Sequence, residues 1–295
     1  MTVDQDAARD FLASSARVLD RRRFELLFRE GEPGAVLAAL DGYRNGDGGY
    51  GWGLEPDLRS ATSQPGGALH AMEVFAETGA DGAGRIHELC AWLAAASLPD
   101  GGLPFALPVP DPSACAPFWV SADPTRSSLQ ITAVVAATAH RVAAVVPGVA
   151  GDPWLARAGE YCLAAIGGLG AGSPAMELAF AVQFLDAVGS TRPEVVELVE
   201  RLRPVIPADG LLHVAGGAPD EYMRPLDFAP FPGGPGRSLF APDVVEAELD
   251  RLATGQQADG GWAVDFASYS PAATLEWRGH RTVQALALLR ANGRV

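Results

Sequence analysis

Residues 46–65 read GDGGYGWGLEPDLRSATSQP, and this stretch decides the fold. A glycine-rich turn, two aromatic residues, a pair of carboxylates and an arginine stand here between two segments of helical periodicity. An aspartate followed by two glycines reverses the chain, because its carboxylate hydrogen-bonds nearby backbone and glycine accepts a positive φ. The Asp47 turn recurs at Asp100 and Asp259, and in a weaker form at Asp209. The chain is therefore built from repeated units.

The spacing of these turns predicts the architecture. Asp47 and Asp100 are 53 residues apart, Asp209 and Asp259 are 50 residues apart, and the 109 residues between the two pairs hold two units. Periods of about 20 to 50 residues indicate solenoids or closed arrays. Each unit contains a helix with a charged face, the turn, a loop and an apolar helix, without useful strand-like alternation. We therefore predict an all-α protein.

The predicted helices follow the apolar periodicity. Segment 1–30 is expected to hold one helix, over 5–28, and helix-pair repeats are expected to fill 31–293 of a single domain spanning 1–295. The repeat helices are expected at 34–44, 65–78, 84–97, 127–146, 153–166, 174–188, 193–203, 243–254 and 279–291. With charged helices outside and apolar helices inside, about five helix pairs would close into a single α/α toroid with long Pro/Gly-rich loops.

Composition excludes some classes of protein. The net charge of -14 and the pI near 4.7 argue against nucleic-acid binding, which needs a basic face to displace counterions. All 22 basic residues are arginine, which together with abundant alanine, glycine and proline is typical of a GC-rich genome such as that of an actinobacterium.

The N-terminus and the cysteines predict a cytoplasmic protein. The sequence MTVDQDAARDF lacks the positive start and apolar core of a signal peptide, and no apolar run reaches the ~18 residues of a spanning helix. The 3 cysteines are widely spaced and odd in number, so we expect free thiols. Peripheral membrane contact and the oligomeric state are left open.

The last repeat carries a resemblance to a known family. Residues 256–262 read QQADGGW and resemble the QW repeat of triterpene cyclases, and residues 45–50 and 99–103 are weaker copies. Over about 30–293 the chain resembles the terpenoid cyclase and prenyltransferase superfamily, whose α/α toroids include squalene-hopene cyclases and protein prenyltransferase β subunits. The resemblance implies one toroid and an apolar, isoprenoid substrate in its central cavity.

The toroid also implies where a site would lie, because the loops after the turns lead to the inner helices and converge on one mouth of the cavity. The candidate catalytic residues there are Glu55, Asp57, Asp123 and Glu276. The candidate substrate-binding residues are Trp52, Arg59, Trp119, Arg126, Trp277, Arg278 and His280, with Asp227, Phe228 and Phe231 in a long loop that would cover the opening. The arginines bind an anionic ligand or simply pair with the neighbouring carboxylates.

The segment Glu55-Pro56-Asp57 is the sharpest candidate. Proline favours an extended conformation for Glu55, and residues two apart in an extended segment point to the same side. The two carboxylates would then share a proton, which raises one pKa into the range of a general acid. An equally weighted alternative is an acidic loop that serves the following helix and pairs with Arg59.

A metal centre and a cofactor are not expected. Protein prenyltransferases bind zinc through an Asp-x-Cys pair and a histidine, and His280 resembles that histidine in position. No Asp-x-Cys pair occurs in the chain, and a catalytic zinc needs about three protein ligands. The DxDD motif of protonating cyclases and the DDxxD motif of diphosphate-ionising synthases are also missing from the sequence.

The leading hypothesis is a terpene cyclase-like enzyme that protonates an isoprenoid or similar apolar chain and cyclises or rearranges it. Asp57, aided by Glu55, would be the acid, with Trp119 and Trp277 beside the developing cation. One alternative is a toroid without catalysis that binds a hydrophobic or anionic ligand. Another is a glycan-active α/α barrel with a carboxylate acid and base.

Overall fold

The structure is a computed structural model that describes residues 3–189 and 192–295; residues 1, 2, 190 and 191 of the predicted domain lie outside this part. The described chain is mostly helical, as predicted. Its α-helices are α1 (Gln5–Ser15), α2 (Val18–Phe28), α3 (Pro33–Leu40), α4 (Pro65–Thr78), α5 (Ala83–Ala96), α6 (Pro117–Val120), α7 (Leu129–Val145), α8 (Pro153–Ile166), α9 (Ala175–Val188), α10 (Val195–Leu202), α11 (Pro225–Phe228), α12 (Pro242–Thr254) and α13 (Pro271–Ala291). Two short strands, β1 (Leu212–His213) and β2 (Tyr222–Met223), form an antiparallel pair.

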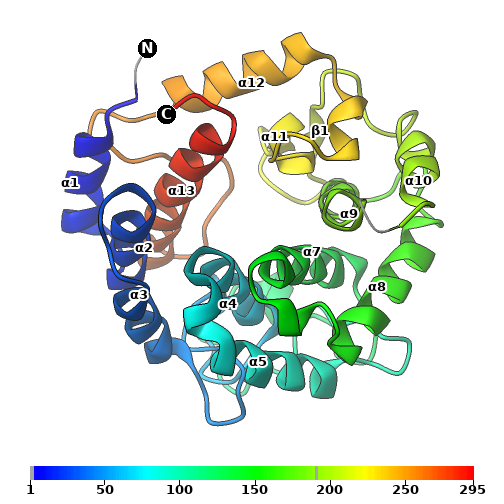
Figure 1. Cartoon of the computed structure of the whole chain (residues 1–295), viewed down its shortest axis with the longest axis horizontal. Coiled ribbons are helices and arrows are strands. Elements are labelled where there is room, and N and C mark those ends of the chain that lie inside the picture. The colour runs from blue at the N-terminus through cyan, green and yellow to red at the C-terminus, as the bar shows by residue number, and fades with distance from the viewer. Residues whose placement is uncertain (1–2, 190–191) are drawn as a thin grey trace.

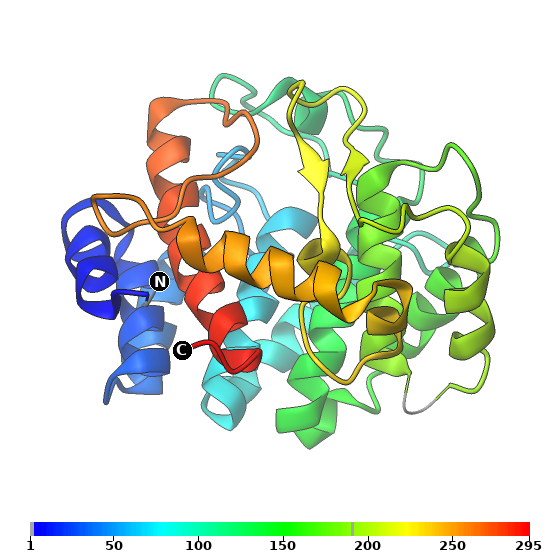
Figure 2. The ribbon, with the colours of Figure 1, turned by 90° about the horizontal axis from the view of Figure 1, so that it is seen from above.

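The helices lie in two layers around the middle of the molecule (Figure 1). Helices α4, α7, α9 and α13 lie inside, and α3, α5, α8, α10 and α12 lie outside them. Helix α4 packs against α7, which packs against α9, while α13 contacts α1, α2 and α12. In the view of Figure 2, the N-terminal end of α13 and the β1–β2 hairpin reach toward the same side. No helix in the described ranges combines the length and apolar character needed to cross a bilayer.

The aspartate–glycine turns have the predicted geometry. The Asp47 carboxylate accepts a hydrogen bond from the Gly49 amide at 2.9 Å, and the three other turns repeat this bond. Each middle glycine has a positive φ, between 70° and 93°. In three of the turns it also touches a helix carbonyl: an added Cβ would lie 2.9 Å from Glu88 O in α5, 2.7 Å from Arg157 O in α8 and 2.1 Å from Ala7 O in α1. Each of these three turns therefore packs against a helix from another part of the chain.

Two predicted helix boundaries are wrong. The expected helix over 5–28 is broken at Ala16, which is extended (φ -98°, ψ 164°), because α13 approaches closely there: a Cβ on Gly279 would lie 2.7 Å from Ala16 Cβ. Helix α13 begins at Pro271 rather than at 279, since the Ser270 hydroxyl caps it by accepting from the Ala273 amide. Glu276, Trp277 and Arg278 therefore lie inside the helix instead of in the loop before it.

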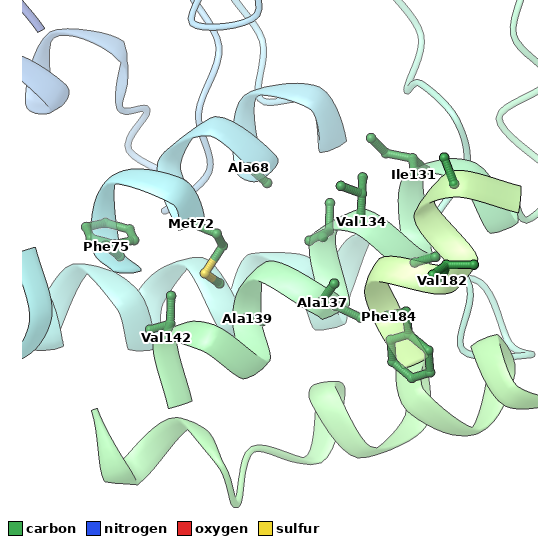
Figure 3. Packing of buried hydrophobic residues seen from close by; sticks show 14 of the residues in the cluster. Ala68, Met72, Phe75, Ile131, Val134, Ala137, Ala139, Val142, Val182 and Phe184 are labelled. Carbon is green, nitrogen blue, oxygen red and sulfur yellow. The ribbon is translucent and has the colours of Figure 1, made fainter. Parts of the chain in front are cut away.

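The apolar core lies between the inner helices and the layer around them (Figure 3). Met72 and Phe75 of α4, Val142 of α7 and Phe184 of α9 are fully buried. Helix α7 is buried on most of its faces, which agrees with its predominantly apolar sequence. This packing holds α4 in a fixed orientation, and α4 carries three of the site residues described below.

The last turn provides a test of the fold. Replacing Gly260 by alanine is expected to destabilise the protein by about 1–3 kcal/mol, because φ is +92° there and the new Cβ meets the Ala7 carbonyl. Urea unfolding measures this change. Gly151→Ala is the control, since that glycine has open space around it. Equal unfolding midpoints for the two variants would contradict the packing of the turn on α1.

Candidate functional site

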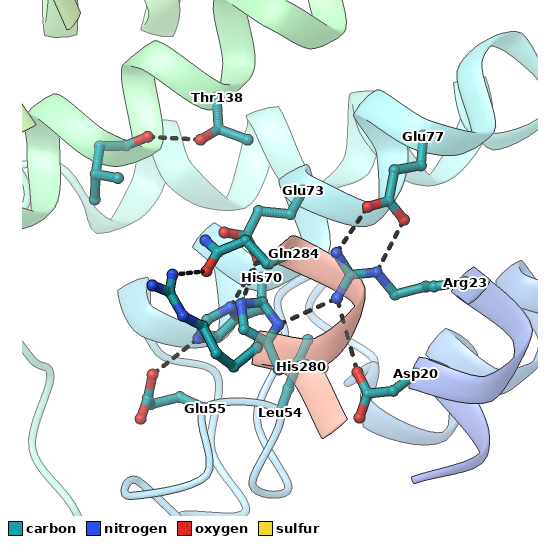
Figure 4. Close-up of polar contacts among 12 residues, drawn as sticks. Asp20, Arg23, Leu54, Glu55, His70, Glu73, Glu77, Thr138, His280 and Gln284 are labelled. Carbon is teal, nitrogen blue, oxygen red and sulfur yellow. Dashed lines mark hydrogen bonds and ion pairs between the residues drawn. The ribbon is translucent and has the colours of Figure 1, made fainter. Parts of the chain in front are cut away.

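Charged side chains from distant parts of the chain meet inside the molecule (Figure 4). We call this group the central charged array, and its members are Asp20 and Arg23 of α2, Glu55 of the loop before α4, His70, Glu73 and Glu77 of α4, and His280 of α13. Asp20, Arg23, Glu55, His70 and His280 are buried. Buried charges are costly unless they pair, and these residues pair with one another.

His70 stands between two carboxylates. Its Nε2 is 2.9 Å from Glu55 Oε2, and its Nδ1 is 2.9 Å from Glu73 Oε2. Burial acts to lower the pKa of His70, but the charge of Glu73 and the hydrogen bonds with both carboxylates raise it to about 9. At neutral pH, His70 is therefore an imidazolium that donates one N–H to each carboxylate.

Glu73 is the carboxylate shared by both histidines. Burial acts to raise its pKa, but the imidazoles of His280 and His70 and the Arg23 guanidinium hold the pKa well below its usual range. The Glu73 side chain is 17% exposed, more than its two histidine neighbours, so it faces the solvent-accessible part of the array.

The pKa of His280 is shifted in the opposite direction to that of His70. Burial and the nearby Arg23 outweigh the attraction of Glu73 and lower the pKa of His280 to about 3. The two imidazole rings are only 5.0 Å apart, centre to centre. Two neighbouring histidines thus hold different protonation states at neutral pH, one charged and one neutral.

The loop carboxylates Glu55 and Asp57 have separate partners. Asp57 Oδ1 accepts from the Tyr269 amide at 2.8 Å and the Ser268 hydroxyl at 3.2 Å, and Oδ2 accepts from Trp277 Nε1 at 2.8 Å. Glu55 Oε1 accepts from the Asp57 amide at 3.1 Å. Asp57 therefore anchors the segment around the start of α13, while Glu55 joins the array.

Some of the other predicted site residues lie close to the array. The Trp277 ring is 5.6 Å from the rings of both His70 and His280. Arg59 pairs with Glu276 at 2.6 Å. Trp119 stacks on Phe105 with ring centres 4.4 Å apart, and its buried Nε1 has no hydrogen-bond partner within the described ranges.

The remaining predicted residues are not brought to the array. Arg278 pairs with the turn carboxylate of Asp259 at 2.8 Å. Asp123 bonds to Thr125 of its own loop. Arg126 and Trp52 are exposed, and Trp52 has the unusual φ of 57°.

Of the three residues of the predicted cover, Asp227 and Phe228 lie in α11 and Phe231 lies in the segment after it. Asp227 accepts from the Arg224 amide at 2.8 Å, and burial raises its pKa to about 6. Phe228 is fully buried against Phe240. The Phe231 ring lies 5.3 Å from the Arg141 guanidinium.

Of the central charged array, only Glu55 and His280 are among the residues predicted from the sequence. His70 and Glu73 are three residues apart on a helix that otherwise reads as apolar, and two polar residues on one face of an inner helix are the signal that could have found them. Asp20 and Arg23 have the same spacing on α2, but an arginine-rich helix reads as solvent-exposed. Only their packing against α13 and α4 reveals them.

The ligand atoms of His70, Glu73 and His280 lie within 4.8 Å of one another, as a metal site requires. Glu55 would support His70 as a ligand, because metal-binding histidines donate their other N–H to a carboxylate. His280 does not fit, because Arg23 Nη1 lies 3.1 Å from its Nδ1 and a guanidinium can only donate. To bind a metal through Nε2, His280 would have to carry its proton on the nitrogen that faces Arg23. The array is therefore better suited to holding protons than a metal ion.

The described residues form surface hollows, two of which are lined by residues outside the central charged array. One of about 160 Å³ lies between 59–62 and 110–114, and the other lies beside Val3 and Arg29. The hollow beside Val3 and Arg29 has a mainly polar lining, whereas the hollow at 59–62 is lined by both polar and apolar atoms. The chain matches no protein-family model and no curated protein sequence.

The charge of His70 can be tested through stability. Because its pKa is raised to about 9, its stabilising effect is complete below about pH 6.5, the pKa of an unfolded histidine, and is lost as the pH rises through 9. We expect the melting temperature of the wild type to fall more steeply between pH 7 and 10 than that of His70→Gln.

His87→Gln, at an exposed histidine, is the matched control and should keep the wild-type pH dependence. The melting temperatures are measured by circular dichroism. Parallel curves for the wild type and His70→Gln would contradict a charged His70.

Proposed function

We propose that the helices form a single α/α toroid like those of terpenoid cyclases and prenyltransferases. The supporting helix pairs, each with the outer member first, are α3 with α4, α5 with α7, α8 with α9, α10 with α11, and α12 with α13. The last turn packs against α1 as the first two pack against α5 and α8. Helix α1 thus takes the place of the outer helix that would follow the last unit, which would close the ring.

We also propose that the protein is an acid–base enzyme with its centre at His70 and Glu73. The single observation that carries this is the position of the His70 ring, 2.9 Å from a carboxylate oxygen of both Glu55 and Glu73 and 5.0 Å from the His280 ring. Neighbouring titratable groups whose pKa values are pushed apart are the usual mark of an acid–base pair. In the proposed reaction His70 supplies the proton to the substrate, and the ionised Glu73 carboxylate keeps His70 protonated and stabilises the positive charge that develops.

Partly exposed side chains on the inner helices support access to this centre. On α4, Leu69, Glu73 and Ala76 form one partly exposed stripe, and on α13 Trp277 and Arg281 continue it at helical spacing. A substrate that reaches Glu73 would therefore contact the Trp277 ring. An aromatic face stabilises positive charge, which favours an unsaturated, isoprenoid-like substrate that is cyclised or rearranged after protonation.

Ligand binding without catalysis is the second candidate, and two arginines favour it. Arg141 of α7 bonds to Thr138 at 3.1 Å, and Arg281 bonds to Gln284 at 2.8 Å. Within the described ranges neither has a carboxylate partner at ion-pair distance, although both are partly buried. Such arginines suit an anionic group on a ligand. The glycan-active alternative has less support, since His70 bridges Glu55 and Glu73 and leaves no open groove between them.

Solvent deuterium tests the enzyme proposal. The protein is incubated in D₂O with isoprenoid alcohols, diphosphates and triterpenes, and products are analysed by mass spectrometry. We expect deuterated products from the wild type. Glu73→Gln should reduce their formation by about 100-fold or more, because it removes the carboxylate that keeps His70 protonated.

Glu30→Gln, at an exposed glutamate of the N-terminal segment, is the control and should retain full activity. Equal deuterium incorporation by the wild type and Glu73→Gln would exclude Glu73 from the reaction. Ligand binding by the wild type without any product would favour the second candidate.

A further inference from the structure

We infer that Arg23 is a positioning residue that holds His280 as the neutral Nε2–H tautomer, and that this N–H binds a hydroxyl group of the substrate. The inference rests on the proposed function, because it names the kind of group that the proposed acid–base centre recognises. It assigns a role to α2, which lies outside the repeated units.

The tautomer follows from the chemistry of the two side chains. Arg23 Nη1 lies 3.1 Å from His280 Nδ1. A guanidinium has five N–H donors and no acceptor, so the nitrogen that faces it must accept. A proton on Nδ1 would place two donors against each other in a buried site. The single proton of a neutral His280 therefore resides on Nε2.

Arg23 cannot easily turn away from His280. Its Nε and Nη2 donate to the two oxygens of Glu77 at 2.8 and 2.7 Å, which fixes the plane of the guanidinium. Asp20 Oδ1 lies 3.7 Å from Nη1, and Asp20 is itself held by Arg17 at 2.8 Å. Arg23 is only 4% exposed, so water does not compete for its donors.

The Nε2–H of His280 is free for a ligand. The nearest carboxylate oxygen is Glu73 Oε2 at 3.8 Å, which is beyond hydrogen-bond distance. That oxygen already accepts from His70 Nδ1 at 2.9 Å. Within the described residues, Nε2 of His280 has no hydrogen-bond partner.

A hydroxyl group suits the position between His280 and Glu73. Its oxygen can accept from Nε2–H while its proton is donated to the Glu73 carboxylate. A carbonyl oxygen would meet Glu73 with no proton to offer, and an anionic oxygen would be repelled by the carboxylate. The geometry therefore selects an alcohol.

The titratable groups around His280 act in opposite directions: Glu73 and Asp20 favour the charged ring, whereas Arg23 and His70 favour the neutral one. From α2, Asp20 and Arg23 face it, and from α4, His70 and Glu73 face it. Burial is the largest influence on His280, and it favours the neutral ring. We therefore expect one tautomer throughout the range from pH 5 to 9.

Nitrogen NMR tests this directly on the full-length protein. Histidine is labelled with ¹⁵N, long-range proton–nitrogen spectra are recorded from pH 5 to 9, and His280→Gln identifies the His280 signals. We expect a bare Nδ1 and a protonated Nε2 at every pH. A protonated Nδ1, a doubly protonated ring at pH 6, or averaged tautomers would overturn the inference.

Variants separate positioning from general structural support. Arg23→Met should release the tautomer, and Arg23→Lys should restore it, because lysine is also a donor without an acceptor. Arg21→Met, at an exposed arginine of α2, should leave the His280 signals unchanged. A folded Arg23→Met protein with unchanged His280 signals would contradict the role of Arg23. If Arg23→Met does not fold, the wild-type spectra decide the question.

Small probes test the hydroxyl. Methanol can donate and accept, whereas acetonitrile only accepts. We expect methanol to shift the His280 Nε2–H signal and acetonitrile to leave it in place; equal shifts, or none with methanol, would overturn the assignment of an alcohol. These measurements need no turnover, so they can succeed while the deuterium assay fails, and the reverse also holds.

Discussion

The structure depends on the neutralisation of charges that folding removes from water. The carboxylates involved are Asp20, Glu55, Glu73 and Glu77, and the cations are Arg17, Arg23 and the His70 imidazolium. Removing one partner from a buried pair typically costs about 3–5 kcal/mol, because the other charge remains buried. The array joins α2, α4, α13 and the loop before α4, so the same contacts that hold the ends of the chain together also build the candidate site.

The helical character and the turns could be predicted from the sequence because they depend on local residue patterns. Each aspartate–glycine turn forms its own hydrogen bond and requires a positive φ. The repeat can therefore be recognised from the sequence without knowing which segments pack around each turn. One error arose where distant segments meet, and the other arose from a local signal. The break at Ala16 reflects the close approach of Gly279, and the early start of α13 depends on a Ser270 cap that was overlooked.

The members of the site were harder to predict from the sequence, for a physical reason. Its residues are separated by up to 260 positions, from Asp20 to His280, and only tertiary packing brings them together. The sequence named Glu55 as a catalytic candidate and His280 as a substrate-binding candidate, and both lie in the central charged array. It gave Asp57 the role of acid, whereas the structure surrounds that carboxylate with three donors. A histidine and a glutamate on one face of an apolar inner helix were the better signal.

The central claim is that His70 is a charged imidazolium between Glu55 and Glu73 at neutral pH. Neutron diffraction from a deuterated crystal at pH 7 tests it most directly, because deuterium atoms are then visible. The account predicts deuterium on both Nδ1 and Nε2 of His70 and on Nε2 alone of His280. A singly protonated His70, or a metal ion bound between the two histidines, would contradict it.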